Sequence, residues 1–329
     1  MRPAAPDAHS LGVVPVRTRE QEVEPLINLS EITEVELIIL KRMREFTIGD
    51  HASMFHGTGF DYVGLRDWQA GDRFEHIDWP QSSLNNFSPL VVREFEQPTT
   101  SSVIMAVDRS ASTRCGATGA TNENRGMQIA TLIARAIATV GMSAVFFQDS
   151  IGMITFDEGF HQLGAVRPRI GKGQVIHCLE AYQHGTGLQE IRNVGSLSAT
   201  FSGFSRKTAM MPVISDFLFD EVPEFLRELR QVNNIHDVFL MIVDASFAFE
   251  MPKVSAGWVE VYDVETGRTR MLSRRELSRQ SERVKAWQNE VARLAKDNDL
   301  DVVRLSVDQV KFDVSLVEWV SERRLRRRK

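Results

Sequence analysis

Three polar side chains follow an apolar run at a spacing of two, a pattern suited to binding a hard metal ion. The run SVIMAVD covers residues 102–108 and ends in Asp108, which is followed by Ser110 and Ser112. Carboxylate and hydroxyl oxygens are the ligands that Mg²⁺ prefers in proteins. A spacing of two lets both serines reach the same point from one loop. The stretch therefore predicts one half of an oxygen-only metal site.

A second carboxylate ends another apolar run, AMMPVISD over residues 209–216, whose last residues are Ser215 and Asp216. Both runs are short and lack polar alternation, as expected for strands buried on both faces. In a doubly wound sheet of strand order 3-2-1-4-5-6, strands 1 and 4 are neighbours, and ligands bind at their carboxyl ends. We therefore expect Asp108 and Asp216 to meet in one crevice.

The elements that must position these residues predict an α/β fold with a doubly wound, mostly parallel sheet. From residue 101 onward, strands alternate with helices. Six strands are predicted, at residues 102–108, 143–149, 151–157, 209–216, 237–244 and 300–307. Only Ser150 separates the second from the third, so the third is expected to run antiparallel at an edge of the sheet. Pro212 is an objection to a central fourth strand, because proline cannot donate a ladder hydrogen bond.

Helices are predicted where apolar residues recur every three or four positions. They cover residues 34–46, 123–140, 172–183, 188–201, 221–231, 274–297 and 313–325. A further hairpin is predicted over residues 257–272, with its turn at 265–267.

Length and composition indicate a globular protein. The 329 residues are 43% hydrophobic and carry a net charge of −5, which implies no nucleic-acid partner. We expect a disordered tail over residues 1–30, a helix and a separate Gly-Asp/Ile-Asp-Trp module over 31–100, and the sheet-bearing domain over 101–329. No stretch resembles a signal peptide or is long enough to span a bilayer. With only two cysteines, we expect a cytoplasmic protein without a transmembrane segment.

Together with one loop threonine, the two strand ends resemble the metal-ion-dependent adhesion site of von Willebrand factor A domains. That site combines Asp-x-Ser-x-Ser after the first strand with a loop Thr and an Asp after the fourth. The matching residues are Asp108, Ser110, Ser112, Thr186 and Asp216. The resemblance implies a von Willebrand A-like domain that binds Mg²⁺, or Mn²⁺ or Ca²⁺, through these side chains. It also implies that a carboxylate of a partner protein completes the metal's ligands.

The stretch upstream resembles the family catalogued as domain of unknown function 58. Its pattern is matched within residues 57–79 and 90–96, at Phe60, Asp61, Arg66, Gly71, Asp72, Ile77, Asp78, Trp79, Arg93 and Glu94. Trp68 stands where the family usually has Tyr, and His76 where it usually has Arg. The resemblance implies partnership with a MoxR-type ATPase in a chaperone-like role. One branch of the family is linked to assembly of methanol dehydrogenase.

Several of these residues have a second interpretation. The serines and aspartate that follow the first strand can cap a helix or form a turn, and Thr186 between two glycines can be a turn residue. A salt-bridge network that holds the upstream module against the sheet is the interpretation we favour for Arg66, Asp72, Asp78 and Arg93. Cys115 lacks a nearby base and is expected to be a spectator thiol. The basic end RRLRRRK is expected to be solvated.

Two classes of function follow. The first is a metal-dependent interaction factor that assists assembly or maturation of a client protein, for example a metalloenzyme. The second is a phosphatase of the haloacid-dehalogenase type, with Asp108 as nucleophile and Mg²⁺ as cofactor. That chemistry needs a second Asp where Ser110 stands, and a Lys near the crevice. Because no nucleophilic triad or phosphate-binding glycine loop stands out either, we expect that the protein is not an enzyme.

Overall fold

The computed structural model describes most of the chain. The described residues are 25–48, 61–70, 72, 74–96, 102–117, 127–157, 163–191, 196–205, 208–249, 257–262, 268–306, 316–317 and 319. Most of the predicted tail over residues 1–30, the turn at 265–267, most of the helix at 313–325 and the basic end lie outside them.

The chain divides into two compact units. The large unit comprises residues 1–40 and 101–329, and the small unit comprises residues 41–100. In the small unit, two antiparallel strands accompany a short 3-10 helix and a short α-helix. These elements are β1 (Asp61–Asp67), η2 (Phe74–His76), α2 (Trp79–Leu84) and β2 (Val91–Glu96).

A mostly parallel sheet of seven strands, in the order β13-β10-β9-β3-β6-β7-β8, forms the centre of the large unit. The strands are β3 (Ser102–Asp108), β6 (Ser150–Phe156), β7 (Leu163–Arg169), β8 (Gln189–Ile191), β9 (Ala209–Ser215), β10 (Asp237–Val243) and β13 (Asp301–Leu305). Of these, β7 alone runs antiparallel to its neighbours. The α/β class and the mostly parallel sheet are confirmed. The count of six strands is wrong, because the short β8 lies outside β7 at the edge.

The second predicted strand, residues 143–149, is also wrong. Its first four residues, Ser143–Phe146, form the last turn of α3 (Ile129–Phe146). This helix is buried on nearly every side, so its apolar residues show no one-sided period that would separate a helix from a strand. The real second strand is β6, and its antiparallel partner is β7. With this change and with the short β8 set aside, the other six strands lie in the predicted order 3-2-1-4-5-6.

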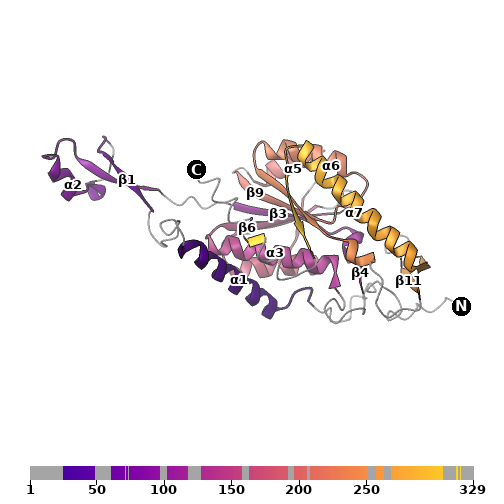
Figure 1. Cartoon of the computed structure of the whole chain (residues 1–329). Coiled ribbons are helices and arrows are strands. Elements are labelled where there is room, and N and C mark those ends of the chain that lie inside the picture. The colour runs from indigo at the N-terminus through magenta and orange to yellow at the C-terminus, as the bar shows by residue number, and fades with distance from the viewer. Residues whose placement is uncertain are drawn as a thin grey trace. The chain divides into compact units, whose positions relative to one another are not determined.

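Helices cover both faces of the sheet, with α3 on one face and α5, α6 and α7 on the other (Figure 1). The other helices are α1 (Leu29–Ile48), α4 (Lys172–His184), α5 (Leu197–Phe204), α6 (Val222–Asn233) and α7 (Arg274–Asp297). The predicted helix at 188–201 instead divides into β8 and α5. Buried strand side chains such as Ile104 and Val213 pack against α5–α7 to form the core of that face.

Shorter elements complete the large unit. They are η3 (Ala111–Arg114), β4 (Gly116–Ala117), β5 (Met127–Gln128), η4 (Ser246–Phe249), β11 (Trp258–Tyr262) and β12 (Thr269–Ser273). Strands β11 and β12 form the predicted hairpin. Before α1, Ile27 is buried and the Leu26 amide donates to the Gln183 side chain at 3.0 Å.

Pro212 is accommodated in the central strand β9. On the β10 side, it stands opposite Phe239 in a continuous register. On the β3 side, the register runs from Val103–Met210 to Ala106–Val213, and no pairs are formed between them. The missing N–H of the proline therefore falls at an interruption of this ladder.

Candidate functional site

The carboxyl ends of two adjacent parallel strands bring the predicted aspartates together. Asp108 is the last residue of β3, and Asp216 follows Ser215, the last residue of β9. Strands β3 and β9 pair directly and in parallel. Both carboxylates are fully buried. The arrangement agrees with the strand-end argument from the sequence.

The loop after β3 turns both serines toward the aspartates. The Ser110 amide donates to Asp108 Oδ1 at 2.7 Å, which closes a tight turn. The hydroxyls of Ser110 and Ser112 lie 3.0 Å apart. The Ser112 hydroxyl donates to Asp216 Oδ1 at 3.2 Å. Four of the five predicted ligands therefore form one connected group, which we call the acid pair site: Asp108, Ser110, Ser112 and Asp216.

Ser215 links the two strand ends. Its hydroxyl donates to Asp108 Oδ2 and accepts the Phe217 amide at 2.7 Å. Both carboxylate oxygens of Asp108 are therefore engaged, because Oδ1 accepts the Ser110 amide.

The carboxylate of Asp216 differs from that of Asp108 in how its two oxygens are hydrogen-bonded. Its Oδ1 accepts the Leu218 amide at 3.0 Å, but its buried Oδ2 has no hydrogen-bond partner among the described residues. Burial, and next the negative charge of Asp108, raise the pKa of Asp216 to about 7. A buried, incompletely bonded carboxylate beside a second carboxylate is unfavourable unless a proton or a cation neutralises it.

The residues of the acid pair site fit a hard divalent cation. They supply two carboxylates and two hydroxyls, and the free Oδ2 of Asp216 is an oxygen with unused capacity to bind a metal. Among the described residues, no group of three or more His, Cys, Asp and Glu side chains is placed to hold a metal. The site would therefore depend on its serine hydroxyls, which favour Mg²⁺ or Ca²⁺ over softer metals.

Thr186 is not joined to this group. It is exposed in the turn between α4 and β8, and no described hydrogen bond links it to the acid pair site. The flanking glycines are required by the backbone, since Gly185 has φ +71° and Gly187 has φ +74°. A Cβ at Gly187 would lie 2.6 Å from His177 Cε1. The turn interpretation of Thr186 thus agrees with its position.

Two side chains near the acid pair site were missed by the sequence reasoning. Tyr182 of α4 is buried, and burial together with the charge of Asp108 raises its pKa. Arg109 is half-buried, and its guanidinium lies where a side chain at Gly185 would be, 3.2 Å from the position of a Cβ. Its place directly after Asp108 was the available signal. The Arg109 guanidinium lies at the carboxyl end of α4, where the helix dipole favours positive charge.

The upstream motif forms ion pairs inside the small unit. Arg66 binds both oxygens of Asp72 at 2.7 Å each, and Arg93 binds Asp78 at 2.8 Å. The Gln81 amide and Arg93 lower the pKa of Asp78. All four partners belong to residues 41–100, so these ion pairs connect parts of the module itself. That the same residues hold the module against the sheet stays a prediction.

The other motif residues have fewer described contacts. Asp78 caps the first turn of α2, where its carboxylate accepts the Gln81 amide at 3.1 Å, and the next residue, Trp79, is exposed. Glu94 pairs with Gly64 between β2 and β1. Gly71 lies outside the described residues.

The two cysteines differ in exposure. Cys115, at the end of η3, is partly exposed, while Cys178 in α4 is buried. Burial raises the pKa of Cys178 to about 12.

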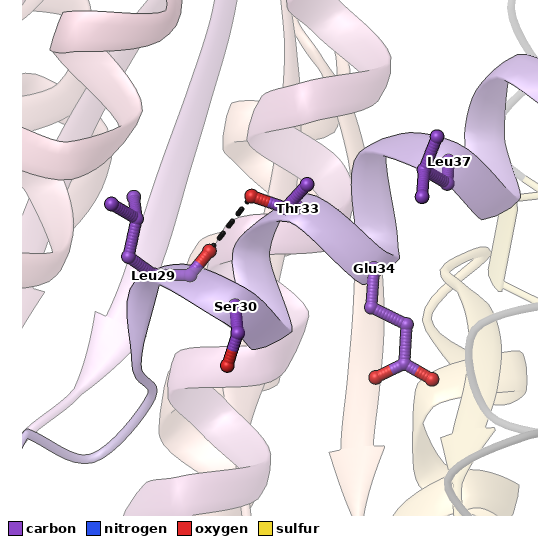
Figure 2. A pocket seen from close by; sticks show the side chains of 5 residues that line it. All are labelled: Leu29, Ser30, Thr33, Glu34 and Leu37. Carbon is purple, nitrogen blue, oxygen red and sulfur yellow. Dashed lines mark hydrogen bonds between the residues drawn. The ribbon is translucent and has the colours of Figure 1, made fainter.

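A shallow pocket lies on one face of α1 (Figure 2). Its lining comes from consecutive turns of one helix: Leu29, Ser30, Thr33, Glu34 and Leu37. The Thr33 hydroxyl donates to the Leu29 carbonyl at 2.9 Å. With a single carboxylate, the pocket offers no cluster of titratable groups.

In the described part of the chain, α3 is the one helix long and apolar enough to cross a membrane. Of its 18 residues, 83% are buried within the fold, as in the core helix of a globular domain.

Two solved structures are similar to this chain. One is a conserved hypothetical protein, BatB from Bacteroides thetaiotaomicron, with 15% identity and a TM-score of 0.34. The other is an aerotolerance-related membrane protein from Bacteroides fragilis, with 11% identity and a TM-score of 0.37. Each match covers 68% of this chain and 99% of the other. No curated protein matches the chain.

The expected cytoplasmic location is corrected by this comparison. The Bacteroides fragilis structure is of a membrane protein, so we withdraw the cytoplasmic prediction and assign no location.

The family comparison is more extensive than either structural match. One family model, that of the DUF58 proteins of unknown function, matches residues 64–292. The match includes most of the upstream motif and the whole acid pair site. The chain belongs to the DUF58 family.

Proposed function

We propose that this protein is a divalent-cation-dependent interaction factor with a von Willebrand A-like domain. Asp108, Ser110, Ser112 and Asp216 would hold Mg²⁺, or Mn²⁺ or Ca²⁺, and a carboxylate of a partner protein would complete the ligands. The observation that carries this proposal is the buried Asp216 Oδ2, which has no hydrogen-bond partner and lies beside a second buried carboxylate. A bound cation would neutralise this charge and polarise the incoming carboxylate.

The phosphatase alternative is less well supported. An aspartate nucleophile needs an oxygen that can reach a substrate, but Asp108 is fully buried and both of its oxygens accept hydrogen bonds. Ser110 stands where that chemistry needs an acid. We therefore propose binding, without catalysis, as the role of the site.

The partner that the family resemblance implies is a MoxR-type ATPase, which would act with this protein on a client during assembly or maturation. In this proposal the acid pair site contacts the partner, while Thr186 remains a turn residue on the surface beside it.

A pull-down from native lysate tests the proposal. The baits are wild type, Asp108→Ala and Asp216→Ala, each with Mg²⁺ or EDTA, and bound proteins are identified by mass spectrometry. Asp244→Ala is the matched control, because Asp244 follows the next strand, β10, and accepts the Ser246 amide at 2.9 Å in a similar turn. We expect a partner retained only by wild type and the control in Mg²⁺. Equal retention in EDTA would contradict a cation-dependent contact.

A further inference from the structure

The residue after Asp216 has a backbone conformation that bulky side chains rarely adopt. Phe217 has φ +55°, in the left-handed region, and its side chain is fully buried. Its ring packs against Phe219 and Phe225, with centroids 6.2 and 6.5 Å away. Such a conformation persists only when surrounding contacts fix it.

Two adjacent side chains of α7 make contacts of this kind. Trp287 Nε1 donates to the Phe217 carbonyl at 2.7 Å, and Gln288 Nε2 donates to the Asp216 carbonyl at 2.9 Å. The Phe217 amide is bound by the Ser215 hydroxyl. The main chain on both sides of the Asp216–Phe217 peptide is therefore held by side chains.

Gln288 also connects this segment to the next strand. The same Nε2 donates to the Val243 carbonyl at 2.7 Å, at the end of β10, and the amide is buried. Helix α7 thus binds the ends of β9 and β10 together. A third α7 side chain, Ser281, donates to the Ser246 carbonyl at 3.2 Å, and no described hydrogen bond joins it to Asp216 or Phe217.

We propose that Trp287 and Gln288 are positioning residues for the divalent cation. They hold the Asp216 main chain in the conformation that directs its carboxylate toward Ser112 and Asp108. The proposal rests on the proposed function, since it assumes that Asp216 binds a cation. It assigns a role in binding to a helix that contributes no ligand of its own.

The physical reason is that the main chain sets the place of a short carboxylate. If the Asp216 and Phe217 carbonyls lost these donors, the main chain at Phe217 could rotate toward a common backbone conformation and move the Asp216 carboxylate out of the acid pair site. Residues that orient metal ligands typically affect affinity by about 10- to 100-fold when they are replaced.

The test measures Mn²⁺ binding to the full chain by electron paramagnetic resonance, which distinguishes free from bound ion. The variants are Trp287→Phe, which removes the indole N–H and keeps a ring, and Gln288→Leu, which removes the amide. Ser281→Ala is the matched control, because it removes another buried hydrogen bond between α7 and a neighbouring element, η4. Asp216→Ala tests the ligand itself, and circular dichroism confirms that each variant is folded at the temperature of the titration.

We expect the Mn²⁺ dissociation constant to rise about 10-fold or more in Trp287→Phe and Gln288→Leu, and to stay within about twofold of wild type in Ser281→Ala. Wild-type affinity in both positioning variants, with binding lost in Asp216→Ala, would overturn this proposal alone. An equal loss of Mn²⁺ affinity in Ser281→Ala would also overturn it, because the loss of any hydrogen bond from α7 would then be enough to weaken Mn²⁺ binding. Wild type that fails to bind Mn²⁺ would overturn the proposed function together with it.

Discussion

At the scale of single residues, the two aspartates of the acid pair site have unequal surroundings. Asp108 has hydrogen bonds to both carboxylate oxygens, whereas Asp216 has a buried oxygen without one. The charge of Asp108 acts on Asp216 in addition to burial. Asp216 is therefore the residue at which the cost of burying two carboxylates side by side is concentrated.

Replacing Asp216 by Asn should stabilise the metal-free protein and abolish cation binding. The substitution removes one of two like charges buried together. We expect the melting temperature in EDTA to rise by about 2–4 °C for each kcal/mol by which the free energy of unfolding increases. The stabilisation of the fold by Mg²⁺ should disappear. Scanning calorimetry measures both effects. Asp244→Asn, outside the pair, is the control, and an equal rise there would argue against relief of repulsion.

The same residue predicts a pH dependence. The pKa of Asp216 is raised in the folded state from an ordinary value of 3.8 to about 7. Between these values the folded state binds more protons than the unfolded state, so the stability contribution is present below about pH 4 and is lost as pH rises through 7. When the pH is raised from 5.5 to 7.5 in EDTA, the melting temperature should fall further for wild type than for Asp216→Asn. An equal fall of the melting temperature in both proteins would contradict the assignment of this pH dependence to Asp216.

The sequence was sufficient to predict that Asp108, Ser110, Ser112 and Asp216 meet, because parallel neighbouring strands present their carboxyl ends together. It was not sufficient to place Thr186, because the spacing of residues along the chain does not determine whether a turn residue after a helix points toward the acid pair site or toward solvent. Trp287 could be read only as part of an apolar stripe. Its hydrogen bond to the Phe217 carbonyl depends on how α7 packs against the segment that follows β9.

At the scale of elements, the carboxyl end of α4 lies next to the acid pair site. The helix ends at Gly185 in a left-handed conformation, and the space left by the missing side chain is occupied by the Arg109 guanidinium. The turn that ends the helix and the position of the Arg109 guanidinium thus both depend on Gly185.

Gly185→Ala should therefore destabilise the protein, by about 1 kcal/mol or more, because the backbone conformation is unfavourable for alanine and its Cβ would press on Arg109. Gly173→Ala is the matched control in the same helix, with open space around its Cβ. That substitution should stabilise the protein by about 0.4–1 kcal/mol. Urea unfolding measures both free energies, and a neutral Gly185→Ala would refute the steric argument.

Element boundaries could be predicted best where helices are amphipathic. The predicted bounds of α7 agree with the structure because one face is charged and the other buried. The same reasoning failed at α3, which is apolar on nearly all sides, and at residues 188–201, where a three-residue edge strand precedes a short helix.

At the scale of the whole molecule, the candidate ligands and the family motif belong to different units. The acid pair site lies in the large unit, and the Arg66–Asp72 and Arg93–Asp78 ion pairs lie in the small unit. Each pair connects elements of the β1–β2 hairpin with the segment between its strands. Cation binding and the integrity of the motif should therefore be separable.

Replacing residues 49–100 by a long Gly/Ser linker tests this separation. We expect the variant to bind Mn²⁺ within about twofold of wild type, because it retains every ligand and both positioning residues, and a flexible linker leaves the large unit unrestrained. Arg66→Ala in the full chain should likewise leave Mn²⁺ affinity unchanged. A loss of affinity in the folded linker variant would show that the small unit contributes to the cation site.

The contrast between the two cysteines has a practical consequence. Only the thiolate reacts with maleimides, and a pKa of about 12 leaves almost none of it on Cys178 at neutral pH. Cys115 is partly exposed and lies three residues beyond Ser112. The natural sequence thus offers one selective attachment point for a fluorescent dye, close to the candidate cation. Emission from that dye would follow ion and partner binding without any engineered residue.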